Sequence, residues 1–170
     1  MKLEQYIRNI PDFPKEGILF RDITTLLNDK KAFKQSIDEL AKLVKDKHIE
    51  YIVAAEARGF IFGGALAYKL GCSFVPVRKP GKLPFKTYKH TYALEYGEDT
   101  LEIHQDAFPL NSKVLILDDL LAIGGTAFAM VKLVEKLNAD IVAIAFLIEL
   151  TFLKGRKKIN KYPIISLIKY

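Results

Sequence analysis

Short runs of apolar and β-branched residues recur along the chain, and longer amphipathic stretches separate them. Four runs predict strands that are buried on both faces: Tyr51–Ala55, Ser73–Val77, Val114–Leu117 and Ile141–Ile148. Strands that alternate with helices imply right-handed crossovers and parallel pairing. The predicted fold is therefore α/β, with a mainly parallel central sheet flanked by helices.

The helical stretches place apolar side chains three and four residues apart. The first has its apolar face at Phe33, Ile37, Leu40, Ala41 and Val44, behind a possible cap at Asn28 or Asp29. A later one has its face at Ala127, Met130, Val131, Val134 and Leu137. Between them, residues 59–70 are rich in glycine and alanine, which lets a helix lie close to a sheet.

Two regions interrupt this alternation. Residues 1–28, with two prolines and a glycine, predict a small N-terminal hood separate from the sheet. Residues 78–84 predict a basic loop without regular structure. A hairpin follows, with strands in 85–95 and 100–103 and a turn at 96–99. We expect residues 1–170 to form a single domain.

Composition limits the kind of partner. The net charge is +6, but the lysines are scattered and no arginine-rich run is present, so an anionic small substrate is expected rather than nucleic acid. No apolar segment reaches the ~18 residues of a membrane span, and the N-terminus lacks a signal-peptide core. The single cysteine, Cys72, fits a reducing cytosol, so a cytoplasmic protein is expected. The histidines, His48, His90 and His104, have no metal-ligand spacing.

The chemistry concentrates in Val114–Thr126. Asp118 and Asp119 follow an apolar strand, and ligands of parallel sheets lie beyond the carboxyl ends of the strands. Gly124 and Gly125 then open a helix, where free amides and the positive end of the dipole can hold a phosphate.

The order of these groups indicates the ligand. Two carboxylates repel a phosphate but suit the vicinal hydroxyls of a ribose, whose 5-phosphate would reach the glycine turn. The segment lacks both Gly-x-x-x-x-Gly-Lys-Ser/Thr and Gly-x-Gly-x-x-Gly, the signatures of nucleotide and dinucleotide folds. The alternative is a strand that ends in acids, followed by an ordinary glycine turn.

Two acids followed by a small-residue turn resemble the diphosphoribose-binding motif of the type I phosphoribosyltransferases. The chain is most similar to the members of that family that use adenine, through six stretches in the expected order: Pro11–Pro14, Gly17–Thr24, Arg58–Phe60, Val77–Pro84, Leu94–Gly97 and Glu149–Thr151. The resemblance implies a pentosyltransferase that moves the phosphoribosyl group of 5-phosphoribosyl 1-diphosphate to N9 of adenine, giving AMP and diphosphate in purine salvage. The alternatives are another purine base, or a non-catalytic regulator that senses phosphoribosyl diphosphate.

The resemblance also implies a role for each site residue. Asp118 and Asp119 would hold the ribose hydroxyls. The 5-phosphate would lie at Ala122, Ile123, Gly124, Gly125 and Thr126. The diphosphate would lie at Ala57, Arg58, Arg78, Lys79 and Lys82. The last three lie on the basic loop, which the resemblance implies is part of a flexible lid formed by residues 78–103. For Arg58 the alternative is a surface salt bridge, and for the lid a merely solvated basic loop.

Adenine would contact the N-terminal hood. The Phe20 ring would stack on the base, the Leu19 carbonyl and the Arg21 N–H would read its edge, and Leu150 would close the other face. Glu95 would be the general acid that protonates N7. The alternatives are a core-filling role for Phe20 and an ordinary hairpin carboxylate at Glu95. The resemblance further implies a homodimer, and Mg²⁺ held mainly by the diphosphate and water.

The chain departs from the family at Ile123, where a threonine is usual. Isoleucine removes one hydroxyl donor to the 5-phosphate. A hydrogen bond to a charged group contributes ~1.5–3 kcal/mol, so affinity for phosphoribosyl diphosphate should be about 10–100-fold lower. We expect a weaker but working site.

Overall fold

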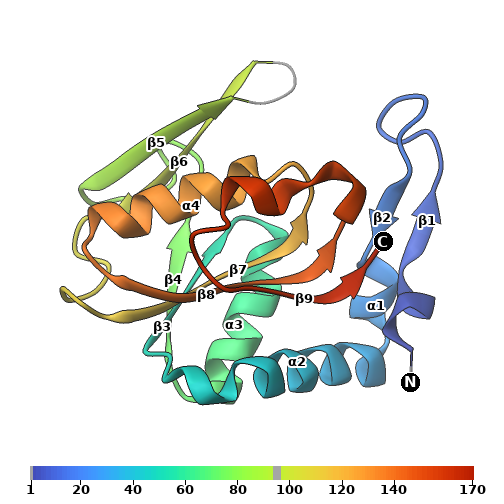
Figure 1. Cartoon of the computed structure of the whole chain (residues 1–170), viewed down its shortest axis with the longest axis horizontal. Coiled ribbons are helices and arrows are strands. Elements are labelled where there is room, and N and C mark those ends of the chain that lie inside the picture. Colours follow the sequence, from blue (N-terminus) through green and yellow to red (C-terminus); the bar gives the residue numbers. More distant parts are fainter. Residues whose placement is uncertain (1, 94–96) are drawn as a thin grey trace.

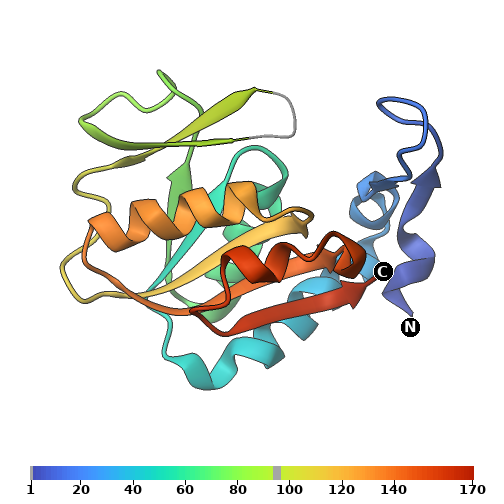
Figure 2. The same ribbon diagram turned by 45° about the horizontal axis from the view of Figure 1, so that its top comes forward.

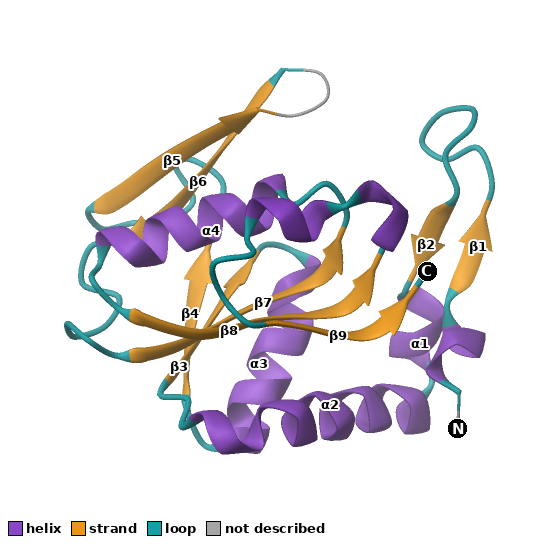
Figure 3. Ribbon diagram, viewed as in Figure 1, coloured by secondary structure: helices purple, strands orange, loops and turns teal. Residues whose placement is uncertain are grey.

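The computed structural model describes residues 2–93 and 97–170 of the chain. A parallel sheet of five strands forms its centre, in the order β4-β3-β7-β8-β9 (Figure 1). The strands are β3 (Tyr51–Ala55), β4 (Ser73–Val77), β7 (Lys113–Leu121), β8 (Asp140–Glu149) and β9 (Ile164–Lys169). Helices cover both faces of the sheet, so the predicted fold class is confirmed (Figure 3).

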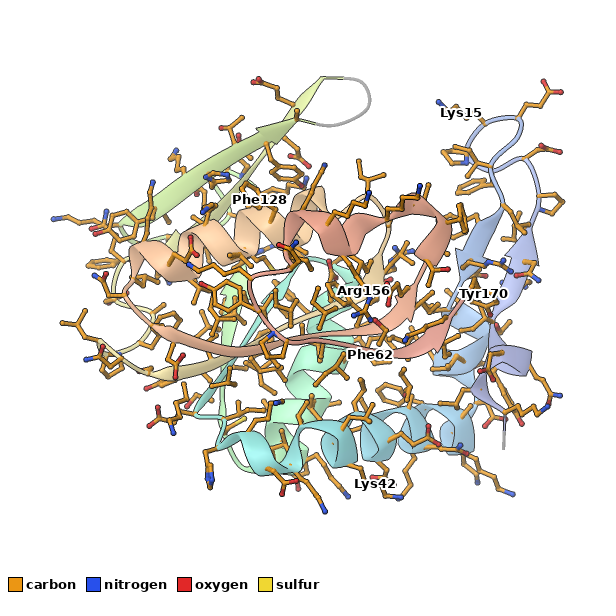
Figure 4. The ribbon with its side chains drawn as sticks, in the orientation of Figure 1. Lys15, Lys42, Phe62, Phe128, Arg156 and Tyr170 are labelled. Atoms are coloured by element: carbon orange, nitrogen blue, oxygen red, sulfur yellow. The ribbon has the colours of Figure 1, made fainter. Side chains whose placement is uncertain are left out.

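The sheet serves two cores because successive side chains on a strand point to opposite faces. On β3, Ile52 packs in the core under α2 (Lys30–Val44) and α3 (Arg58–Leu70). Its neighbour Val53 packs in the other core, under α4 (Gly125–Lys136). Phe62 of α3 is fully buried between helix and sheet (Figure 4).

The cap of α2 is Asp29, not Asn28. Its carboxylate accepts hydrogen bonds from the backbone N–H groups of Lys31 and Ala32, at 2.9 and 2.8 Å. The helix then buries the predicted face, except that Phe33 is only partly covered. Among the described residues, no helix combines the length and the apolar character needed to cross a membrane.

The N-terminal segment contains a 3₁₀ helix, η1 (Leu3–Tyr6), the strands β1 (Arg8–Ile10) and β2 (Phe20–Asp22), and the short helix α1 (Thr24–Asn28). β1 and β2 pair with each other and are not part of the central sheet. The segment is not separate in its packing, however, because its apolar side chains are buried in the same core as α2. In Figures 1 and 2 the segment lies beside the carboxyl end of β9, next to the C-terminus.

The predicted hairpin is formed by β5 (Thr87–Ala93) and β6 (Glu98–His104), on the α4 side of the sheet (Figure 2). The predicted turn at 96–99 was partly wrong, because Glu98 and Asp99 belong to β6 and Asp99 pairs with Tyr92. Residues 94–96 lie outside the described part of the chain.

Three features of the sheet differ from the prediction. β7 does not end at Leu117 but continues to Leu121, because its last residues pair with β8. β4 is not buried on both faces, since it lies at the edge of the sheet and Ser73 is exposed. The pattern also missed β9 and, outside the sheet, the 3₁₀ helices, which besides η1 are η2 (Lys45–Lys47), η3 (Thr151–Leu153) and η4 (Gly155–Lys158).

α3 lies very close to the sheet at one of two adjacent glycines. A Cβ atom at Gly63 would lie 2.7 Å from Phe74 Cε2 and 2.9 Å from Ala54 Cβ. A Cβ atom at Gly64 would meet no atom within 4 Å. Only Gly63 is therefore required by packing.

This contrast predicts opposite effects of one added methyl group. Gly64→Ala should raise the free energy of unfolding by about 0.5–1 kcal/mol, because alanine loses less backbone entropy. Gly63→Ala should lower it by about 1–3 kcal/mol, because the same gain is outweighed by overpacking. Urea unfolding of the two variants measures both changes. Equal stabilities would show that α3 can move away from the sheet at no cost.

Candidate active site

The topology of the sheet places a cavity at the ends of β3 and β7. From β3 the chain crosses to β4 on one side, whereas β7, β8 and β9 follow on the other side. Ligands of open α/β sheets bind where the direction of winding reverses in this way. A cavity of about 420 Å³ is found there, lined by residues 56–58 after β3, residues 118–127 of β7 and α4, and Tyr92 of β5.

Two buried carboxylates lie at the floor of this cavity. Asp118 accepts a hydrogen bond from the Asp119 N–H at 2.9 Å, and no cation pairs with it among the described residues. Burial and the charge of Asp119 raise the pKa of Asp118 well above its usual value. Burial also raises the pKa of Asp119, while Arg58, whose Nε lies 2.8 Å from Asp119 Oδ2, opposes that rise.

The close fit around Asp118 involves the start of α3. A Cβ atom at Gly59 would lie 2.8 Å from Asp118 Oδ1. Glycine at this position therefore lets the helix that follows β3 come up against the carboxylate of β7. The two segments that line the cavity are thus in direct contact below it.

The glycine turn that opens α4 also lines the cavity. Gly124 has the left-handed φ of 83° that glycine favours, and no side chain caps the helix. The N–H groups of the first turn therefore lack a side-chain partner and can meet an anion. The Thr126 hydroxyl lies 3.3 Å from the Tyr92 hydroxyl, and Ile123, which also lines the cavity, is 39% exposed.

The predicted basic loop is held by carboxylates. Arg78 Nη2 lies 3.1 Å from Glu56 Oε2, and the Lys79 N–H donates to Glu56 Oε1 at 2.6 Å. The Lys79 ammonium pairs with Asp99. Burial tends to raise the pKa of Glu56, but the hydrogen bonds from Lys79 and Arg78 leave it below its usual value. Lys82 is exposed, and its carbonyl accepts a hydrogen bond from Arg78.

The residues predicted to bind a base lie beside the cavity and do not line it. The Phe20 ring centroid is 5.6 Å from the Arg58 guanidinium carbon, and the Leu150 N–H donates to the Leu121 carbonyl at 2.9 Å. Leu19 is exposed. Because side chains alternate along β2, Arg21 points elsewhere, and its guanidinium stacks on Tyr170 at 3.8 Å.

Two polar side chains that line the cavity, those of Glu56 and Tyr92, are not among the predicted site residues. Tyr92 is the buried residue between exposed neighbours on β5, so alternation along the hairpin was the available signal. Glu56 had no local signal in the sequence, since its partners, Arg78 and Lys79, come from another loop.

Glu95, predicted as the general acid, lies outside the described residues. Within residues 2–93 and 97–170, no group of three or more His, Cys, Asp and Glu side chains is arranged to hold a metal ion.

Comparison with known proteins places the whole chain in one family. A model described as phosphoribosyl transferase domain matches residues 24–168. The chain is 61% identical to adenine phosphoribosyltransferase of Brachyspira hyodysenteriae, over 100% of both chains.

Two solved structures are similar over nearly the full chain. Adenine phosphoribosyltransferase of Thermoanaerobacter pseudethanolicus has a TM-score of 0.96 at 57% identity, covering 99% of this chain and 100% of that one. The Saccharomyces cerevisiae enzyme, complexed with an imino-altritol bisphosphate and adenine, has a TM-score of 0.92 at 45% identity, covering 97% and 96%.

The raised pKa of Asp118 predicts a stabilising substitution inside the cavity. A carboxyl whose pKa is raised by folding favours the folded state below its unfolded pKa, and this contribution is lost as the pH rises through the folded pKa. Asp118→Asn keeps the acceptor for the Asp119 N–H and removes the buried charge. Its free energy of unfolding should therefore exceed that of the wild type by about 1–3 kcal/mol at about pH 8.

The gain from Asp118→Asn should disappear as the pH falls to about 3, below the unfolded pKa of about 3.9, where the carboxyl is largely protonated in both states. Asp46→Asn, at an exposed aspartate, is the matched control and should change stability little at either pH. Urea unfolding at the two pH values measures the difference. Equal stability of Asp118→Asn and the wild type at both values would contradict a strained buried charge.

Proposed function

The chain belongs to the phosphoribosyl transferase family, and we propose that its cavity carries out the adenine phosphoribosyltransferase reaction. The phosphoribosyl group of 5-phosphoribosyl 1-diphosphate passes to N9 of adenine, and AMP and diphosphate are released. The observation that carries the proposal is that one cavity joins two buried carboxylates to the uncapped start of a helix. Relatives with this activity match the full chain, which supports the same assignment.

The ribose 5-phosphate end of the substrate lies along β7 and the start of α4. Asp118 and Asp119 accept hydrogen bonds from the ribose hydroxyls, which is the contact that two carboxylates can make with a neutral polyol. The 5-phosphate meets the turn formed by Ala122, Ile123, Gly124, Gly125 and Thr126. The amides at the start of α4 and the Thr126 hydroxyl suit a doubly charged phosphate. The two aspartates repel that phosphate, so the substrate binds with its ribose hydroxyls, and not its phosphate, toward them.

The diphosphate lies at the end of β3. Ala57 supplies backbone and Arg58 supplies a guanidinium that bridges Asp119 and the anion, since its side chain is 40% exposed. Arg78, Lys79 and Lys82 of the lid add positive charge to the leaving group. Arg78 and Lys79 must then exchange Glu56 and Asp99 for phosphate oxygens, a swap of one charged partner for another.

The base lies between the N-terminal hood and the end of β8. The Phe20 ring stacks on adenine, next to Arg58. The Leu19 carbonyl accepts from the 6-amino group, the Arg21 N–H donates to N1, and Leu150 covers the other face. A 6-oxopurine enzyme would offer a side-chain donor, often lysine, to O6, and the stretch from Leu147 to Leu150 contains none.

Catalysis rests on positioning and on charge. Holding N9 near C1′ removes the entropic cost of bringing two substrates together. As diphosphate departs, the sugar gains positive charge near the two aspartates, and the basic residues stabilise the leaving group. Glu95 serves as the general acid at N7. Closure of the lid excludes water, which would otherwise compete with adenine for C1′.

Magnesium fits this arrangement as a companion of the diphosphate. Asp118 and Asp119 are too few to enclose an ion that prefers six oxygen ligands, so phosphate oxygens and water would supply most of them. The ion would offset the charge of the leaving group.

We further propose that the protein is a cytoplasmic homodimer. Residues 1–170 act as one domain, in which residues 1–28 lie over the base and residues 78–103 form the lid. The family resemblance supports the dimer and the domain layout, and the single cysteine supports the cytoplasmic location.

A direct assay tests the function. Purified protein is incubated with Mg²⁺, phosphoribosyl diphosphate and one purine at a time, and diphosphate release is followed. We expect product with adenine only, because the base site offers an acceptor to the 6-amino group and no donor to a 6-oxo group. Product with guanine, hypoxanthine or xanthine would assign another base, and no product with any base would favour a regulator that senses phosphoribosyl diphosphate.

The residue at position 123 tests the phosphate end of the site. Ile123→Thr should lower the KM for phosphoribosyl diphosphate by about 10–100-fold, because it adds a hydroxyl donor to a charged phosphate. Neither kcat nor the KM for adenine should change. Ile61→Thr, at an isoleucine of α3 with similar exposure, is the matched control. An unchanged KM in Ile123→Thr would show that the backbone amides already saturate the phosphate.

A further inference from the structure

The phosphate turn rests on a second backbone segment from the end of the chain. A Cβ atom at Gly155 would lie 2.2 Å from the Ala122 carbonyl oxygen and 3.1 Å from the Gly124 nitrogen. Conversely, a Cβ atom at Gly124 would lie 2.6 Å from the Gly155 carbonyl oxygen. The two backbones are therefore in contact, with no side chain between them, and Gly155 is buried there.

Arg156 fixes the segment that carries Gly155. Its guanidinium binds both carboxylate oxygens of Glu149, with Nη2 at 2.7 Å from Oε2. The same guanidinium donates to the Ser166 hydroxyl and to the Ile164 carbonyl, each at 3.2 Å. Arg156 thus ties η4 to β8 and β9, and in Figure 4 it lies between the short helix and the sheet.

Glu149 makes this attachment rigid. It is 3% exposed, and it also accepts from the Ser166 hydroxyl at 2.6 Å. Burial opposes its charge, but the hydrogen bonds from Arg156 and Ser166 leave its pKa below the usual value. A planar, two-point contact with a buried carboxylate holds an arginine in one geometry, which a lysine cannot reproduce.

We propose that Arg156 is a positioning residue for the 5-phosphate: through Gly155, it holds the Ala122–Gly124 backbone in the shape that binds the phosphate. Arg156 does not line the cavity. Its effect reaches the substrate through backbone contact alone, at the turn where the left-handed Gly124 leaves the chain most free to change shape. The inference rests on the proposed function, because it assigns the ligand of that turn.

Binding of ribose 5-phosphate, measured by calorimetry, isolates this part of the site. Arg156→Gln should weaken it about tenfold or more, by loosening amides that must converge on one anion. The KM for phosphoribosyl diphosphate should rise by a similar factor. The KM for adenine, at saturating phosphoribosyl diphosphate, should stay within about twofold. Arg156→Lys should recover only part of the loss, because it restores the charge without the two-point contact.

Arg8→Gln is the matched control. It removes another arginine–carboxylate pair, in which Arg8 Nη2 lies 2.6 Å from Asp22 Oδ2, at a position outside the cavity. It should reduce thermal stability and leave ribose 5-phosphate binding unchanged. A general loss of stability would therefore affect both variants, whereas loss of positioning affects Arg156→Gln alone.

The outcomes separate this inference from the proposed function. Wild-type protein that does not bind ribose 5-phosphate would overturn both. Wild-type binding that is unchanged in Arg156→Gln, or a parallel loss of adenine and phosphate affinity, would overturn the positioning role and leave the function intact. If Arg156→Gln does not fold, the same comparison is made with Arg156→Lys, which keeps the charge beside Glu149. Ribose 5-phosphate binding that is unchanged in Arg156→Lys would then overturn the positioning role.

Discussion

Burial of two adjacent carboxylates at the end of a central strand is the costly feature on which the rest of the structure depends. Asp118 and Asp119 lie on β7, which pairs with a strand on each side and cannot shift to relieve them. Arg58 compensates one of the charges, and Gly59 leaves room for the other. The two apolar cores supply the stability that allows such a site, since burying an uncompensated charge costs free energy.

Charge compensation also explains the arrangement around the cavity. Two of the cations on the basic loop are not free, because Arg78 and Lys79 are already paired with Glu56 and Asp99. Such pairs lower the cost of holding cations near one another while the anionic substrate is away. They also mean that a weak anion gains little by displacing them, so the loop favours a ligand with several phosphate oxygens.

Local features of the chain were predictable, and features that depend on distant contacts were not. β3 and β4 match their predicted bounds because turn residues border their apolar runs. β7 was predicted too short because acids usually end a strand, and only pairing with β8 carries it to Leu121. Residues 118–126 are contiguous, so most of the cavity wall was predictable. Glu56 and Gly155 acquire their roles from segments far away in sequence, and no local pattern marks them.

The contact between Gly124 and Gly155 has a consequence for how this chain can change. At both positions the atom nearest to an added Cβ is a backbone oxygen of the other segment, so no change of side chain at the partner position makes room for it. A substitution at either glycine therefore has no single compensating substitution at its partner. Redesign of the turn, for a larger or a differently charged anion, would have to move the η3–η4 segment and its anchor at Glu149 together with the loop.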